Sequence, residues 1–138
     1  MSKKLLLIIT VVSTLLSCSK EDDNTIVGKY KMIGIIYNIG AGEDIFRSEN
    51  SNKTIEFHSN GTITSNGELC SMSIEANSTS SGTYSIEKLT INPDDCNDQP
   101  INTAPGTYPL NITFELNGNE LILDYGCTES CGSKYLRQ

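Results

Sequence analysis

The residues that could carry catalysis or bind a metal are few and scattered along this sequence. His58 is the single histidine and stands two residues before Asn60-Gly61, a pair typical of tight hairpin turns. A histidine needs further ligands or triad partners, and the sequence suggests none for it. The segment 94–98, Asp-Asp-Cys-Asn-Asp, offers oxygen ligands without the spacing of a calcium loop. Because no nucleophile or phosphate-binding motif occurs either, we expect no enzyme activity, no metal site and no cofactor.

The remaining reactive side chains are thiols, and the first of them follows an apolar N-terminal run. Two lysines, at positions 3 and 4, precede the apolar segment 5–16. The run is too short to span a bilayer but has the length of a signal-peptide core. The alternative is a buried N-terminal helix, which the lack of an amphipathic period disfavours. We therefore expect residues 1–17 to be a signal peptide that is removed.

The segment Leu15-Leu16-Ser17-Cys18 resembles the lipobox of bacterial lipoproteins. The resemblance implies cleavage before Cys18 and attachment of lipid to its thiol and new amine. Two or more acyl chains anchor a protein stably, whereas one does not. Lipidation of Cys18 would explain why a lone cysteine stands at this junction.

The residues after Cys18 form a short charged tether, residues 18–24. Four of them resemble the lysine-plus-acid export signal of Bacteroidota-type lipoproteins, namely Lys20, Glu21, Asp22 and Asp23. That resemblance implies display on the outer face of the outer membrane. A solvated linker on a periplasm-facing anchor is the alternative.

Removal of residues 1–17 leaves 121 of the 138 residues and a net charge of −9, because eight basic and all 17 acidic residues remain. This length suits one domain, residues 25–138. Such an acidic domain repels phosphate backbones, which argues against nucleic-acid binding. We also expect the domain to be repelled by anionic lipid, so that the anchor attaches it to the membrane without holding its surface against the bilayer.

Four cysteines remain in the domain: Cys70, Cys96, Cys127 and Cys131. An even number in an exported chain favours two disulfides, for which sequence alone permits three pairings. A Cys₄ zinc site and free thiols are the alternatives, although no Cys-x-x-Cys spacing occurs.

The elements that must position these residues are strands. Apolar residues alternate with polar ones in short runs between Asn, Gly, Ser and Pro clusters, which is typical of an all-β fold. Residues 38–50 are predicted as a long loop. The predicted strands are 27–37, 54–58, 62–64, 82–86, 89–92, 110–116, 121–125 and 134–137.

About eight strands in hairpin order close most simply as an antiparallel up-and-down barrel, and a β-sandwich is the alternative. In the barrel, alternating strand directions place the loops that carry all four cysteines at one end. Proximity then suggests the pairs Cys70–Cys96 and Cys127–Cys131.

The domain resembles small lipocalin-like domains of secreted and lipid-anchored bacterial proteins. The resemblance lies in the segments 26–30, 54–62, 82–86 and 134–137. Lipocalins place Gly-x-Trp on the first strand with a late arginine packed over the indole. Here Gly28 and Tyr30 hold those places, no tryptophan occurs, and Arg137 is the candidate for a cation–π contact with Tyr30.

The resemblance implies a possible cavity for one small apolar ligand, because an eight-stranded interior is either filled by side chains or open. The possible wall is Ile55, Phe57, Ile112, Phe114, Leu121 and Leu123. One hypothesis is a lipid-anchored, surface-exposed barrel that binds such a ligand. The other is a solid barrel whose loops, 38–50, 93–108 and 126–132, bind a protein or glycan.

Overall fold

The fold is a closed antiparallel β-barrel with one extra strand. The computed structural model describes residues 25–38, 40, 42–94, 96 and 112–138. Its strands are β1 Gly28–Tyr37, β2 Ile45–Ser48, β3 Thr54–Phe57, β4 Thr62–Ser65, β5 Ser80–Ser85, β6 Thr90–Pro93, β7 Ile112–Asn117, β8 Glu120–Asp124 and β9 Cys131–Arg137. No helix among the described residues is long and apolar enough to cross a membrane.

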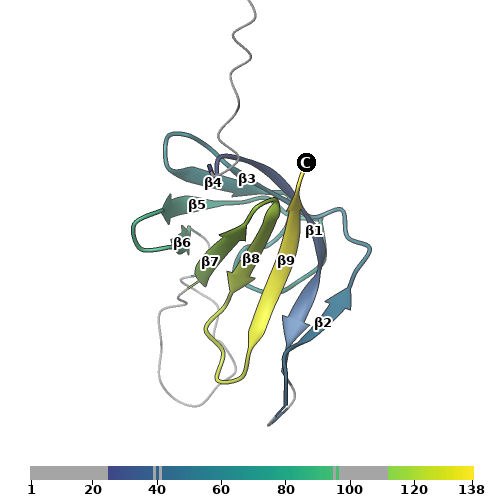
Figure 1. Ribbon diagram of the computed structural model, residues 1–138. Coiled ribbons are helices and arrows are strands. Elements are labelled where there is room, and N and C mark those ends of the chain that lie inside the picture. Colours follow the sequence, from purple (N-terminus) through teal and green to yellow (C-terminus); the bar gives the residue numbers. More distant parts are fainter. Residues whose placement is uncertain (1–24, 39, 41, 95, 97–111) are drawn as a thin grey trace, which may run out of the picture.

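Pairing between the first and last strands closes the barrel. Eight strands pair in the order β1-β3-β4-β5-β6-β7-β8-β9, and β9 returns to β1 from Tyr30 opposite Arg137 to Tyr37 opposite Cys131. A single sheet that closes on itself in this way is the predicted barrel, and it excludes the β-sandwich. Figure 1 shows β7, β8, β9 and β1 side by side around one wall.

The tight turns follow the sequence prediction. Gly61 and Gly118 have φ values of +84° and +61° in the β3–β4 and β7–β8 hairpins. Such conformations favour glycine because it has no Cβ. These turns fix the register that points Ile55 and Phe57 inward opposite Ser65 and Ile63.

The predicted loop 38–50 is wrong in part, because it contains β2. This strand pairs with the second half of β1, from Gly34 opposite Ser48 to Tyr37 opposite Ile45. β3 pairs only with the first half of β1, which leaves the second half in need of a partner. All four β2 residues are exposed, so no inward–outward alternation marked the strand in the sequence.

The last strand is also longer than predicted, since it begins at Cys131 rather than at residue 134. Its first residues, Cys131, Gly132 and Ser133, are small and give no hydrophobic alternation. They are nevertheless buried between β8 and β1. Barrel closure therefore extends this strand beyond its local pattern.

The barrel has two ends, here called the anchor end, after the lipid anchor expected to precede it in the sequence, and the loop end. The chain enters at the anchor end, where β1 begins and β9 finishes; the turns after β3, β5 and β7 also lie there. Because the strands alternate in direction, the segments after β4, β6 and β8 lie at the loop end. Both predicted disulfides, Cys70–Cys96 and Cys127–Cys131, are present in these segments.

Candidate functional site

The three residues singled out by the expected resemblance, Gly28, Tyr30 and Arg137, meet at the anchor end. The Arg137 guanidinium carbon lies 5.0 Å from the centroid of the Tyr30 ring, which confirms the predicted contact. Its Nη2 donates to the Tyr30 hydroxyl at 2.6 Å and also contacts the Thr25 carbonyl, and Nη1 donates to the Val27 carbonyl at 3.1 Å. A Cβ on Gly28 would lie 3.0 Å from Nη1, so the absence of a side chain makes room for the guanidinium.

These contacts seal the anchor end rather than open it. The Tyr30 hydroxyl donates to the Ile26 carbonyl at 2.9 Å, and the Ile26 side chain is buried in the core. Burial raises the pKa of Tyr30, and the nearby Arg137 charge opposes this effect. The cluster therefore fastens the entering chain across the end of the barrel.

The six residues proposed as a cavity wall lie in a packed core. All are buried: Ile55, Phe57, Ile112, Phe114, Leu121 and Leu123. The Phe57 ring contacts Tyr30, Tyr84 and Phe114 edge-on, with centroid separations of 5.8, 5.0 and 5.9 Å. Aromatic side chains therefore fill the interior around Phe57.

At the loop end, Lys53 holds the segment 66–79 over the barrel. Its side chain is fully buried, and its ammonium donates to the carbonyls of Glu68 at 2.5 Å, Ser73 at 2.8 Å and Ser71 at 3.5 Å. Burial lowers the Lys53 pKa to about 8, and the Glu68 charge opposes this effect. Leu69 of the same segment is buried in the core and closes this end.

Sequence reasoning missed this role of Lys53, although a signal was present. Position 53 has the same parity as the inward residues Ile55 and Phe57, just before β3 begins. The inward position of Lys53 indicates a buried ammonium group. Because a buried charge requires compensation, such a group needs hydrogen-bond acceptors such as carbonyl oxygens.

Three hydroxyl groups lie together inside the barrel near β8 and β9. Ser133 Oγ donates to the Tyr125 hydroxyl at 3.5 Å. The Tyr135 hydroxyl lies beside both groups but forms no hydrogen bond of normal geometry with the described residues. Burial raises the pKa of Tyr125 to about 12 and that of Tyr135 well above its ordinary value. Both rings therefore stay neutral at physiological pH.

An open groove of about 590 Å³ crosses the outer face of β7, β8 and β9. Its floor includes Ile122, which alternates with the buried Leu121 and Leu123 and so faces outward. The β5–β6 turn forms one side, and β1 with the segment before β2 forms the other. The groove residues used below are Ile36, Leu89 and Ile122, which are apolar, and Asp44, Glu115 and Asp124, which are acidic.

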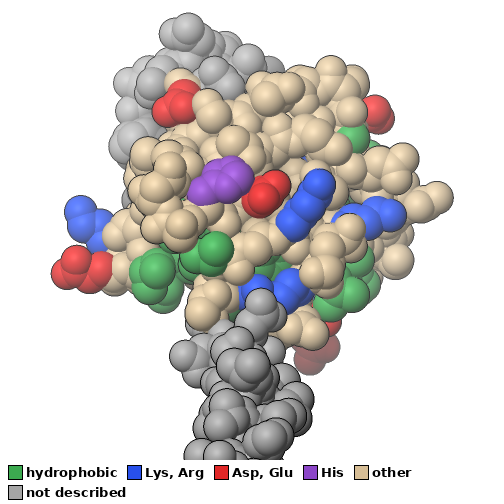
Figure 2. Space-filling view, turned by 90° about the horizontal axis from the view of Figure 1, so that it is seen from above, with side chains coloured by type: hydrophobic (Ala, Val, Ile, Leu, Met, Phe, Trp, Pro, Cys, Tyr) green, Lys and Arg blue, Asp and Glu red, His purple; other side chains and the backbone are tan. Residues whose placement is uncertain are grey.

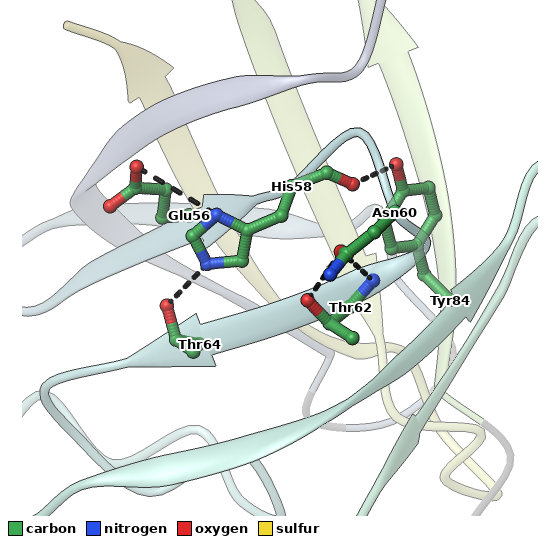
Figure 3. Close-up of polar contacts among 6 residues, drawn as sticks. All are labelled: Glu56, His58, Asn60, Thr62, Thr64 and Tyr84. Atoms are coloured by element: carbon green, nitrogen blue, oxygen red, sulfur yellow. Dashed lines mark hydrogen bonds and ion pairs between the residues drawn. The ribbon is translucent and has the colours of Figure 1, made fainter.

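His58 lies away from this groove and has partners that the sequence did not suggest. Its Nε2 lies 3.0 Å from Thr64 Oγ1, and its Nδ1 lies 4.0 Å from a Glu56 carboxylate oxygen (Figure 3). The order carboxylate, imidazole, hydroxyl is that of a triad, but the Glu56 distance is too long for a hydrogen bond. The side chains of Glu56 and His58 are 47% and 36% exposed on the outer face of a hairpin, so water reaches them freely.

The neighbouring contacts in Figure 3 maintain the shape of the hairpin. Asn60 Oδ1 accepts from the Thr62 backbone at 3.1 Å and from its hydroxyl at 2.7 Å. The Tyr84 hydroxyl donates to the His58 carbonyl at 2.8 Å, which ties β5 to the turn. The hydrogen bonds of His58, Asn60, Thr62 and Tyr84 therefore stabilise the β3–β4 turn.

Several sequence predictions fall outside the described residues. These are the lipidation site Cys18, the export residues Lys20, Glu21, Asp22 and Asp23, and most of the acidic segment 94–98. Within the described ranges, no group of three or more His, Cys, Asp or Glu side chains is placed to hold a metal ion.

Comparison with known proteins gives no relative from which a site could be transferred. No protein-family model, curated protein or solved structure matches the chain. The functional argument therefore rests on the residues and the geometry described above.

Proposed function

We propose that this chain is a lipid-anchored, non-catalytic binding protein on the outer face of the outer membrane, and that it binds a protein partner in the groove over β7–β9. One observation carries the binding site: the interior around Phe57 is packed, whereas the groove on the outer face is open. Asp44 and Ser130, from two of the segments expected to bind a partner, contribute to the groove. Binding sites concentrate on such segments over a rigid scaffold.

The chemistry of the groove selects the kind of partner. Ile36, Leu89 and Ile122 supply an apolar floor, and Asp44, Glu115 and Asp124 surround it with carboxylates, opposed by Lys88. A protein segment that carries both basic and apolar side chains complements this surface. A neutral glycan would leave the carboxylates without a charged partner.

The anchor is tested through the residues that motivate it. Replacement of Cys18 by alanine should release the chain from the membrane fraction, because no thiol remains for lipid. Continued detergent partitioning of this variant would contradict the anchor.

Replacement of residues 20–23 by alanine should keep the anchor but remove protease accessibility on whole cells. Unchanged accessibility would count against surface export.

The groove is tested by charge reversal. We expect Glu115→Lys to weaken photo-cross-linking of the partner from a groove position on whole cells at least tenfold, since a reversed charge now faces a basic segment. Glu75→Lys, an exposed loop residue outside the groove lining, is the matched control and should have little effect. Equal cross-linking by both variants would remove the groove from the proposal.

A small ligand inside the barrel is a second candidate, and the Tyr135 hydroxyl favours it. Buried polar groups almost always meet a protein group, a water or a ligand. This hydroxyl has the Ser133 and Tyr125 hydroxyls beside it but forms no hydrogen bond of normal geometry with the described residues. Native mass spectrometry of the protein offered its envelope extract tests this candidate. A reproducible added mass that Tyr135→Phe removes would support an interior ligand. A bare mass would leave the groove as the binding site.

A further inference from the structure

The anchor end of the barrel carries an exposed patch close to the proposed lipid. Its members are Val27, Lys29 and Leu136, which are exposed, and Lys31, which is partly exposed. These four residues are here called the anchor-side patch. Lys31 lies opposite Leu136 in the β1–β9 pairing, and the Val27 carbonyl accepts from Arg137 on the same strand as Leu136. Val27 and Leu136 are 37% and 42% exposed, so both apolar side chains are accessible from outside the barrel.

The length of the tether keeps this patch near the membrane. Six residues separate Cys18 from Thr25, the first described residue, so the Cα atoms of Cys18 and Thr25 are about 25 Å apart at most when the chain is fully extended. Figure 2 views this end and shows hydrophobic side chains on both sides of the point where the chain enters, with basic side chains next to that point and a few acidic ones on the same face. A lipid on Cys18 would therefore hold this end, and not the loop end, beside the bilayer.

Charge is distributed unevenly between the two ends. The acids nearest the loop end are Glu43, Asp44, Glu49, Glu68, Glu75, Asp94, Asp124 and Glu129. The basic residues there are Arg47, which pairs with Glu49 at 2.5 Å, and the buried Lys53. At the anchor end, Lys29 lies opposite Glu56, and Lys31 and Arg137 lie on the paired strands β1 and β9. Glu120 is paired with Lys134 at 2.8 Å, and the β5–β6 turn carries Glu87 beside Lys88.

We propose that the anchor-side patch rests on an anionic lipid surface, which orients the barrel with its loop end away from the membrane. The proposal depends on the proposed lipid anchor only for proximity, because the patch itself consists of barrel residues. Apolar side chains enter the headgroup region while lysines meet anionic headgroups. The tether has a net charge of −2 from residues 20–23, so the attraction has to come from the barrel.

This proposal revises the expectation drawn from net charge. A total of −9 predicts repulsion from anionic lipid wherever the charge lies. Salt screens charges beyond about 10 Å, so the acids at the far end contribute little at the membrane surface. The charges at the anchor end then determine whether the barrel is attracted to anionic lipid or repelled by it.

The first test follows the orientation of the lipidated full chain in vesicles of phosphatidylcholine with phosphatidylglycerol. An environment-sensitive fluorophore on Leu136→Cys should shift to shorter wavelength, and one on Phe46→Cys at the loop end should not. Phe46 is a matched control because it is a 46% exposed apolar residue on a strand. Equal spectra from the two positions would overturn the proposed orientation.

The second test separates the patch from the anchor by using the mature chain, residues 18–138, with Cys18→Ala, so that neither the apolar segment 5–16 nor a lipid is present. At millimolar anionic lipid, we expect weak association that added salt removes and that Lys29→Gln lowers about fivefold, the effect of one lysine near such a surface. Arg47→Gln changes the net charge equally at the loop end and should have no effect. If the protein did not associate with the vesicles, or if Lys29→Gln and Arg47→Gln weakened the association equally, the proposed membrane contact of the patch would be wrong. This holds whether or not Cys18 carries lipid. Membrane partitioning of the wild type and Cys18→Ala decides the anchor independently.

Discussion

Each end of the barrel is closed around a cation, but the two cations differ in their environment. At the anchor end, Arg137 joins the first and last strands and remains partly exposed. At the loop end, Lys53 is fully buried and holds a long segment by its carbonyl oxygens. The anchor end is therefore closed by residues that the strand pairing already brings together. The loop end is closed only because carbonyl groups compensate the buried charge of Lys53.

The largest expected effect is the loss of the buried cation. Lys53→Met keeps the apolar stem but leaves the carbonyls of Glu68, Ser71 and Ser73 without this donor, so we expect the free energy of unfolding to fall by about 3–4 kcal/mol. Urea denaturation measures the change. Lys29→Met, at an exposed lysine, should stay within about 0.5 kcal/mol. If both variants matched the wild type, Lys53 would not hold the loop.

The two disulfides allow a second comparison within the loop end. Serine replacement of both Cys70 and Cys96, which are 26 residues apart, should cost about 3.5 kcal/mol, because a longer closed loop restricts the unfolded chain more. The same change at Cys127 and Cys131, which are four residues apart, should cost about 2 kcal/mol. Denaturation under oxidising conditions gives both values, and the reverse order would contradict the loop-length argument.

The pH dependence of stability sharpens the contrast. The folded pKa of Lys53 is lowered from 10.5 to about 8, so between these values the unfolded chain holds a proton that the folded chain has released. Stability from this group therefore rises with pH across that window, by about 2 kcal/mol between pH 8 and pH 10. The rise should be absent in Lys53→Met, as urea melts at each pH will show.

The measurement has to stop near pH 10 because three tyrosines act in the opposite direction above it. Burial raises the pKa values of Tyr30, Tyr125 and Tyr135, so they keep their protons in the fold after the unfolded chain loses them. A difference between wild type and variant that falls from pH 8 to pH 10 would show that Lys53 stays protonated in the folded chain.

The smallest expected effect is at the anchor end. Arg137→Lys keeps the charge but cannot reproduce the planar contacts with Tyr30 and the Thr25 and Val27 carbonyls, and should cost about 1 kcal/mol. Arg47→Lys, at an exposed arginine on β2, is the control and should be near neutral. If Arg137→Lys lowered the free energy of unfolding as much as Lys53→Met, closure of the anchor end would contribute as much stability as closure of the loop end.

Local sequence pattern predicted the strands of the barrel and its tight turns, whereas the meeting of Tyr30 with Arg137 was predicted from the lipocalin resemblance. Alternation such as Thr54 to Phe57 and the Asn60-Gly61 turn act over a few residues, so they can be recognised without knowledge of the rest of the chain. Closure of the hairpin order into a barrel then predicted both disulfide pairs, because it brought the cysteine-bearing segments to one end.

The tertiary structure alone decided the position of β2, the burial of Lys53, the packed interior around Phe57 and the separation of charge between the ends. β2 forms because half of β1 lacks another neighbour, and Lys53 is stable inside because a distant segment brings carbonyl groups to it. Each of these features depends on groups far apart in the chain. Hydrogen bonding, desolvation and charge act through space, and the sequence by itself does not give those distances.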